Sequence, residues 1–293
     1  MNLSLIGSEK RHVTMKLANK FRAAVLSVAI STYASAHAQE VDWAGIASAD
    51  SVVIGTLSEL PQFPEDSTYI QIEIMDATTL KGVKVDEVDI RYFTHEAAYN
   101  ISQNQLTALQ NTAVIALYIN FDGDNYFPNI GDAALLPATE ENILAVQSEI
   151  SAQKAIIQNW QPNSKVPHFE TVKKLIDDLT DIDRQFDAGL ALERLGAEAV
   201  PAIIIHMDNR AALGRESISL KNMSSNAFEG VRHYGPKLVV DALAAILNQI
   251  TGENFGSIYN GGSEAQRAHT VNGWRIYTMR SPLYSGKRPS TGK

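Results

Sequence analysis

The chain of 293 residues contains no cysteine. This absence excludes a disulfide framework, a thiolate metal site and a cysteine nucleophile. It also excludes a lipoprotein anchor, because that anchor needs a cysteine directly after the signal peptide. Stability must therefore come from the core, and a chain of this size buries roughly 70–75% of its unfolded surface.

The N-terminal apolar run is too short to span a bilayer, which takes about 20 residues. It covers residues 23–34, follows three basic residues and leads to Ala-His-Ala, which ends at Ala38. This order is typical of a secretory signal peptide. We predict a leader over residues 1–38, with the signal peptide over 15–38, no membrane anchor, and a periplasmic or secreted protein.

Basic residues are scarce once the leader is removed. Residues 1–38 hold five of the 25 basic residues and one of the 33 acidic residues, so their removal changes the formal charge from −8 to −12. An acidic surface argues against nucleic-acid binding, which uses a basic stripe, and against docking on anionic lipid. We therefore expect another protein or an envelope component as the partner, and no nucleic acid.

Compact catalytic and metal-binding motifs are also missing. The sequence has no His-x-x-x-His and no Gly-x-Ser-x-Gly. A calcium-binding loop that starts at Asn120 would need glycine at position 125 and glutamate at position 131. The chain has Asn125 and Gly131 there, so the motif is absent. Ser-x-x-Lys at 151–154 lacks the Lys-Thr-Gly and Ser-Asp-Asn elements that accompany it in penicillin-recognising enzymes. We predict no metal, no cofactor and no catalytic residues.

The first half of the chain has the pattern of β-structure. SVVIGTL is a short β-branched run, and isoleucines alternate strictly with other residues in YIQIEIM (69–75). LKG (80–82) predicts a turn, and ISQNQLTALQN predicts a helical turn or a loop. AVIALYINF (113–121) is apolar throughout, as in a central strand, and Asp-Gly after it predicts a hairpin turn. Short strands at this spacing predict a small barrel or sandwich.

This stretch resembles the small secreted β-barrels with an OB-like core in netrin and tissue-inhibitor modules. The resemblance rests on ADSVVIGTL, TTLKG and AVIALYINF and spans about 75 residues. It implies a barrel. It implies no function, because those modules usually carry disulfides and this chain has no cysteine.

The second half of the chain has a helical pattern. Thr139 suits an N-cap, and the two glutamates that follow lie where a helix dipole favours acids. Residues 138–168 are predicted to form a helix and a linker, because QPNSKVPH contains two prolines. Residues 171–252 are predicted to be helical throughout.

Two helical stretches resemble each other. Gly196 is followed by AEAVPAIIIHMD and Gly235 by PKLVVDALAAIL, 39 residues further on. In this register Ile204 corresponds to Leu243. A period of roughly 40 residues is that of HEAT and armadillo arrays. Residues 181–250 thus resemble HEAT-like repeats of bacterial proteins, which implies a helical domain and no particular activity.

Together these patterns predict an α+β protein with a small N-terminal β-barrel or sandwich followed by a C-terminal HEAT-like α-helical domain. The predicted boundaries are the leader at 1–38, the β domain at 39–137, the helix and linker at 138–168, the HEAT-like domain at 169–280 and a flexible tail at 281–293.

Four polar residues are candidates for binding. Asp208 and Arg210 lie in MDNR, a predicted turn between helices, and the loops of repeat proteins line binding faces. Arg232 and His233 lie in EGVRHYGP at a predicted helix end, where such a cluster binds a carboxylate or connects helices. The alternative for Asp208 and Arg210 is a solvated turn. The alternative for Arg232 and His233 is an ordinary contact between helices.

His206 follows three isoleucines near a predicted helix end. We expect a structural residue there, with the helix dipole favouring its cationic form. The leading hypothesis is a non-catalytic exported protein that binds a partner. The alternative is a periplasmic hydrolase in which His206 or His233 pairs with a carboxylate in the cleft between the domains.

Overall fold

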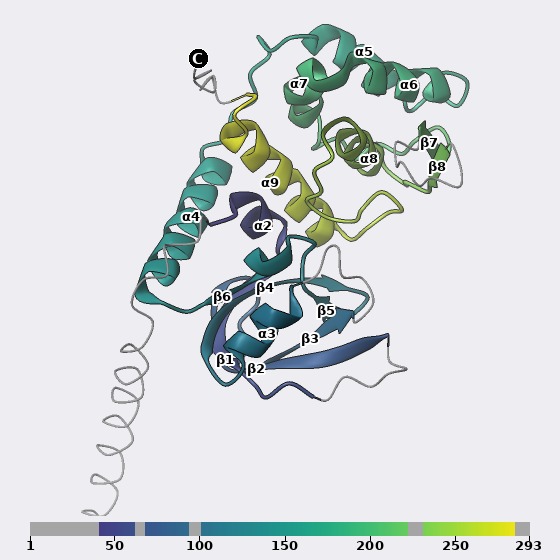
Figure 1. Ribbon diagram of the computed structural model, residues 1–293. Helices are drawn as coiled ribbons and strands as arrows, with labels where there is room; N and C mark the ends of the chain where they lie inside the picture. Colours follow the sequence, from purple (N-terminus) through teal and green to yellow (C-terminus); the bar gives the residue numbers. More distant parts are fainter. Residues whose placement is uncertain (1–40, 62–67, 94–100, 222–230, 285–293) are drawn as a thin grey trace, which may run out of the picture.

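The computed structural model describes residues 41–61, 68–93, 101–221 and 231–284. Within them a β-barrel is followed by a helical region (Figure 1), which confirms the predicted α+β class. None of the described helices is long and apolar enough to cross a membrane. The predicted signal peptide and most of the predicted tail lie outside the described residues.

Five strands form the closed barrel. Around it they are ordered β1 (Ser51–Leu57), β2 (Tyr69–Lys81), β3 (Val88–Phe93), β5 (Asp124–Tyr126) and β4 (Ala113–Phe121), and β4 pairs again with β1. The neighbours are antiparallel except β3 and β5, which are parallel and joined at Arg91 and Tyr126. A short strand, β6 (Leu135–Pro137), pairs with β4 beside β5. The barrel alternative is therefore the one that forms.

Side-chain alternation accounts for strand β2. Ile70, Ile72 and Ile74 are buried in the barrel core, and the residues between them are exposed. The strand includes the first two residues of the predicted turn at 80–82 and ends at Lys81, so the chain leaves the strand at residue 82 and the connection to β3 is residues 82–87. The stretch left open as a helical turn or loop contains helix α3 (Gln103–Leu109), which packs against the barrel core.

The middle of strand β4, residues 114–118, is apolar because both faces of the strand are covered there. Val114, Ala116 and Tyr118 point into the barrel core. Ile115 and Leu117 belong to a different cluster, which they share with helices outside the barrel. The predicted Asp-Gly turn follows the strand, and both residues have positive φ, as a two-residue hairpin of the favoured twist requires.

The remaining elements are mainly helices. They are α2 (Trp43–Ser48), the 3-10 helix η1 (Gly131–Ala134), α4 (Glu140–Gln158), α5 (Phe169–Asp178), α6 (Gln185–Leu195), the 3-10 helix η2 (Gly196–Ala199), α7 (Val200–Ile205), α8 (Val239–Thr251) and α9 (Glu264–Arg280). Thr139 caps α4 as predicted, because its hydroxyl accepts from the N–H of Asn142 at 3.2 Å.

Three apolar clusters hold the structure together. One fills the barrel, and another fills the helical region around α5 to α9. The third joins α2 and α4 to the outer faces of β1 and β4. Figure 1 shows α2, at the start of the described chain, between α9 and the barrel. Helix α2 thus connects the two parts of the molecule.

The predicted continuous helical pattern over 171–252 is wrong in one segment. Strands β7 (Ile218–Lys221) and β8 (Val231–Tyr234) form an antiparallel hairpin before α8. Ile218 and Leu220 are buried and alternate with more exposed residues, which is a strand period. A four-residue strand is shorter than the window of 11 or more residues over which helical periodicity is read. This is why the sequence prediction missed the hairpin.

Candidate functional site

The predicted turn containing Asp208 is present and packs against helix α9. Residues 206–208 form a turn after α7, and the Asp208 carboxylate forms an ion pair with Arg275. The guanidinium carbon of Arg275 also lies 5.6 Å from the centre of the Trp160 ring. These contacts connect the turn to α9 and to the segment after α4.

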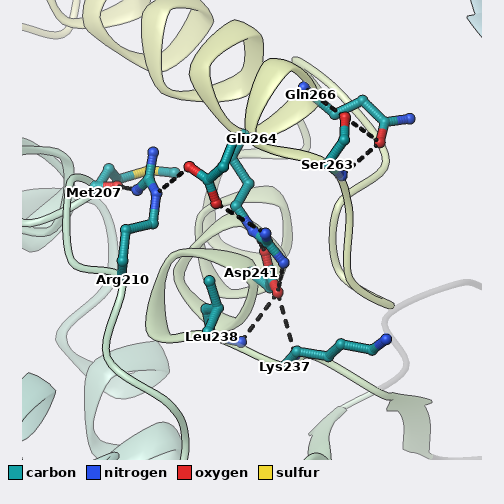
Figure 2. A network of polar contacts seen from close by, with 9 residues as sticks. Met207, Arg210, Lys237, Leu238, Asp241, Ser263, Glu264 and Gln266 are labelled. Atoms are coloured by element: carbon teal, nitrogen blue, oxygen red, sulfur yellow. Dashed lines mark hydrogen bonds and ion pairs between the residues drawn. The ribbon is translucent and has the colours of Figure 1, made fainter.

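Arg210 takes part in a polar network that joins three elements (Figure 2). Its Nε donates to Glu264 at 2.9 Å, and one of its terminal nitrogens donates to the carbonyl of Met207 at 2.9 Å. The other oxygen of Glu264 accepts from Arg267 at 3.0 Å. Hydrogen bonds from both arginines lower the pKa of Glu264. Arg210 thus connects the turn after α7 to the first turn of α9.

The buried end of this network is an ion pair between α8 and α9. Arg267 donates to both oxygens of Asp241, at 2.8 and 3.0 Å. Asp241 is fully buried, and it also accepts from the backbone N–H groups of Lys237 and Leu238 at the start of α8. Every contact of this carboxylate is internal, which indicates a structural role.

Arg232 and His233 lie on strand β8 and not at a helix end, which corrects the prediction. The side chains of both are exposed, and His233 Nδ1 lies 2.9 Å from the hydroxyl of Ser219 on strand β7. They therefore belong to a different element from Asp208 and Arg210.

His206 ends helix α7 and stacks on the Phe169 ring, with 5.4 Å between ring centres. Burial lowers its pKa and outweighs the nearby Asp177. The expected cationic form is therefore disfavoured, because desolvation exceeds the effect of a six-residue helix. Its Nε2 is buried without a hydrogen-bond partner in the described structure. The expected structural role stays a prediction, now with a ring contact as its basis.

A different histidine lies where the barrel meets the helices. Nε2 of His269, on α9, lies 3.0 Å from the carbonyl oxygen of Ser48 at the end of α2, so this nitrogen carries the proton. Nδ1 lies 3.8 Å from Asp50, beyond hydrogen-bond distance. Burial and the charge of Lys81 lower the pKa of His269. No local sequence pattern distinguishes this histidine.

Lys81 approaches the same place from the end of strand β2. Its ammonium donates to the carbonyls of Ile46, Ala47 and Ala49, at 2.6, 3.3 and 2.6 Å. A cation at a helix C-terminus is stabilised by the helix dipole. Burial lowers the pKa of Lys81 to about 8, partly offset by the charge of Asp50. In the sequence, Lys81 is recognisable only as part of the predicted LKG turn.

The histidine at this junction lacks the environment of a nucleophilic hydrolase. In such a site one imidazole nitrogen faces a carboxylate and the other faces a hydroxyl or thiol. Here the proton-bearing nitrogen of His269 is bound to a backbone carbonyl. A cavity lies beside His269, between α2, α4 and α9. None of its lining residues carries a hydroxyl or thiol.

A second concave site lies between α6 and β7. The α6–β7 groove is lined by Ile182, Asp183, Gln185, Phe186, Gly189, Arg215, Ser217, Ile218 and Ser219, with a volume of about 290 Å³. The side-chain amide of Gln185 donates to the carbonyls of Arg215 and Ser217 and accepts from the N–H of Arg215, which connects α6 to the segment before β7. Phe186 is 64% exposed and Ile182 is 53% exposed. None of these residues belongs to the predicted binding residues.

In the described ranges no group of three or more His, Cys, Asp or Glu residues is arranged to hold a metal ion. Comparisons of the chain with protein-family models, with curated proteins and with solved structures give no match.

Proposed function

We propose that the protein is an exported, non-catalytic binding protein that holds an extended segment of another protein in the α6–β7 groove. The observation that carries this proposal is the exposure of Phe186 and Ile182 beside a concave site. Exposed apolar side chains next to a pocket are characteristic of interaction surfaces. The volume suits one or two apolar side chains of a partner.

Charge indicates the chemistry of the bound segment. Residues 177–187 carry five aspartates and one arginine, and that arginine pairs with Asp178 and Asp181. The charged residues that line the groove are Asp183 and Arg215, and neither forms an ion pair within the described chain. Asp187, which follows Phe186 in α6, also forms none there. A segment that places an apolar side chain beside Phe186 and a lysine or arginine beside these carboxylates is complementary.

The relation to HEAT-like repeats belongs to the same proposal. It is supported by α6, η2 and α7, which follow one another closely, and by Ile204 and Leu243, which are both buried in one core as the sequence register predicts. The hairpin β7–β8 precedes α8, where a second pair would begin with a helix. We therefore propose one HEAT-like pair followed by a single helix.

Export rests on the sequence of residues 15–38. When the chain is expressed from Met15 in a bacterium, we expect folded protein in the periplasmic fraction with Gln39 at its N-terminus. N-terminal sequencing of that fraction tests this. Recovery of the folded protein only from the cytoplasm, with its leader intact, would contradict export without affecting the groove.

The binding proposal is tested with a displayed library of random peptides. We expect enriched sequences to combine an apolar residue with lysine or arginine, and Phe186→Ser to weaken binding at least tenfold. Leu144→Ser is the matched control, because Leu144 is 59% exposed on α4, outside the groove. Equal weakening by both variants, or no enrichment at all, contradicts the proposal.

Gly189→Ala separates binding from folding. A Cβ at this position would lie 3.5 Å from the Ile218 side chain, an ordinary contact, so the change narrows the groove without a clash. Replacing a helical glycine with alanine stabilises a fold by roughly 0.5–1 kcal/mol. We expect weaker peptide binding together with unchanged or raised thermal stability.

A further inference from the structure

A cavity of about 120 Å³ lies where α2, the end of β2, α4 and α9 meet. Its polar lining consists of Lys81, Lys154, His269 and two amides, Gln153 and Asn272. None of its lining residues is acidic, although the whole chain carries a formal charge of −8. This lining is suited to an anion.

We propose that this junction cavity binds a small carboxylate with a short alkyl tail. The rest of the lining is mainly apolar and includes Ile150, Ile157 and Ile276. The amide nitrogen of Gln153 already donates to the Trp43 carbonyl and to Glu149. Lys154 and Asn272 therefore supply the donors for a charged head, and the isoleucines contact its hydrocarbon end. The volume holds several water molecules, and hence a ligand of about five non-hydrogen atoms.

The two lysines act in different ways. The three protons of Lys81 are directed to backbone carbonyls, so this residue attracts an anion by charge. Lys154 is exposed at the rim and forms no ion pair within the described residues. Its ammonium is therefore available to donate to a carboxylate.

The protonation of the junction supports this assignment. The charged groups that act on His269 are Lys81 from β2 and Asp50 from the segment before β1, and Lys154 from α4 lines the same cavity. Burial lowers the pKa of both Lys81, to about 8, and His269, so positive charge is costly there without a counterion. A bound carboxylate offsets that cost, and its binding takes up protons.

This site is separate from the α6–β7 groove, since no residue lines both. Either proposal can therefore fail without the other. The experiment uses the mature chain and sodium propionate, with butyramide as an uncharged ligand of similar size. Isothermal titration at pH 7, in two buffers of different ionisation enthalpy, measures both affinity and proton uptake.

We expect propionate to bind with a Kd of about 1 mM, as its few atoms allow, and with net proton uptake. Raising the pH to 9.5 should weaken binding at least threefold, because Lys81 loses its proton. Lys154→Gln should weaken binding about tenfold. Lys174→Gln, on the exposed face of α5, is the matched control and should leave the Kd unchanged.

Three results would overturn the proposal. They are no saturable propionate binding at 50 mM, equal affinity for butyramide, and the same Kd in Lys154→Gln as in the unmodified chain. Lys154 is an exposed residue on the surface of α4, so its replacement leaves the fold intact and loss of binding is interpretable. A circular dichroism melting curve of each variant verifies this.

Discussion

The barrel and the helical region bury polar groups to very different extents. In the described residues, the only buried polar side chain on a barrel strand is that of Ser51. The helices and their ends bury an Asp241–Arg267 pair together with several amides and hydroxyls. The barrel depends on apolar packing, whereas polar contacts help to define how the helices meet. Buried ion pairs add little net stability when intact, but they penalise arrangements that leave one charge alone.

The largest effect is expected when that ion pair is broken. Asp241→Asn leaves the buried Arg267 guanidinium with the exposed carboxylate of Glu264 as its remaining countercharge, so we expect a loss of about 3 kcal/mol in the free energy of unfolding, at the lower end of the cost of breaking a buried pair. Urea denaturation monitored by circular dichroism measures it. The double variant Asp241→Leu, Arg267→Met should recover most of the loss. A double variant as unstable as the single one would show that the charges themselves are required.

An effect of comparable size tests whether the two regions unfold together. Ile115→Ala opens a cavity in the cluster that joins β4 to α2 and α4, at a cost of about 2–5 kcal/mol. The three tryptophans all lie in the helical region or its connections. Tryptophan fluorescence and far-ultraviolet circular dichroism should therefore shift together, because the cluster couples both parts.

Ile72→Ala is the control for this coupling, since Ile72 lies within the barrel core alone. A cooperative molecule shows the same shift in both signals for this variant as well. If fluorescence follows Ile115→Ala but not Ile72→Ala, the barrel is a separate folding unit. In that case the barrel and the helical region are two domains that unfold separately.

The sequence predicted the barrel better than the helical region, and the reason is physical. Alternation in β2 and the Asp-Gly turn after β4 are local signals, and both were confirmed. The apolar run of β4 predicted a central strand, although not the helices that cover its outer face. The hairpin β7–β8 was missed because four-residue strands contain too few residues to establish a period.

The candidate sites were harder to predict because they join distant parts of the chain. The hydrogen bond between His269 and Ser48 spans 221 positions, and no spacing pattern indicates it. The α6–β7 groove likewise depends on a loop that Gln185 holds from 30 positions away. Arg210 was recognisable as a turn residue, but its partner Glu264 was not. Local sequence patterns identify such residues, whereas only the fold identifies their partners.

A smaller effect is expected at His206. His206→Gln removes the ring contact with Phe169 and should cost about 1 kcal/mol at pH 7. The pKa of His206 is lower in the folded protein than in the unfolded chain, so the unfolded chain is protonated first as the pH falls below about 6.5. The folded state therefore loses stability as the pH falls through this range. The variant should lose less stability between pH 7 and pH 5 than the unmodified chain does. Unchanged stability together with lost peptide binding would contradict the structural role.

The smallest effect, and the sharpest comparison between the predicted turn and the groove, comes from two aspartates. Asp208→Asn removes an ion pair whose carboxylate is 66% exposed, so we expect a change of roughly 0–1 kcal/mol that disappears in high salt. Asp183→Asn removes a carboxylate at the groove that has no ion-pair partner within the described residues, so its stability effect should be equally small.

Binding of a selected basic peptide distinguishes the two variants. Asp183→Asn should weaken it severalfold, and Asp208→Asn should leave it unchanged, because its carboxylate is engaged with Arg275. The reverse pattern would mean that partners bind at the turn after α7, where the sequence placed Asp208 and Arg210 as binding residues, and that the groove is not the binding surface.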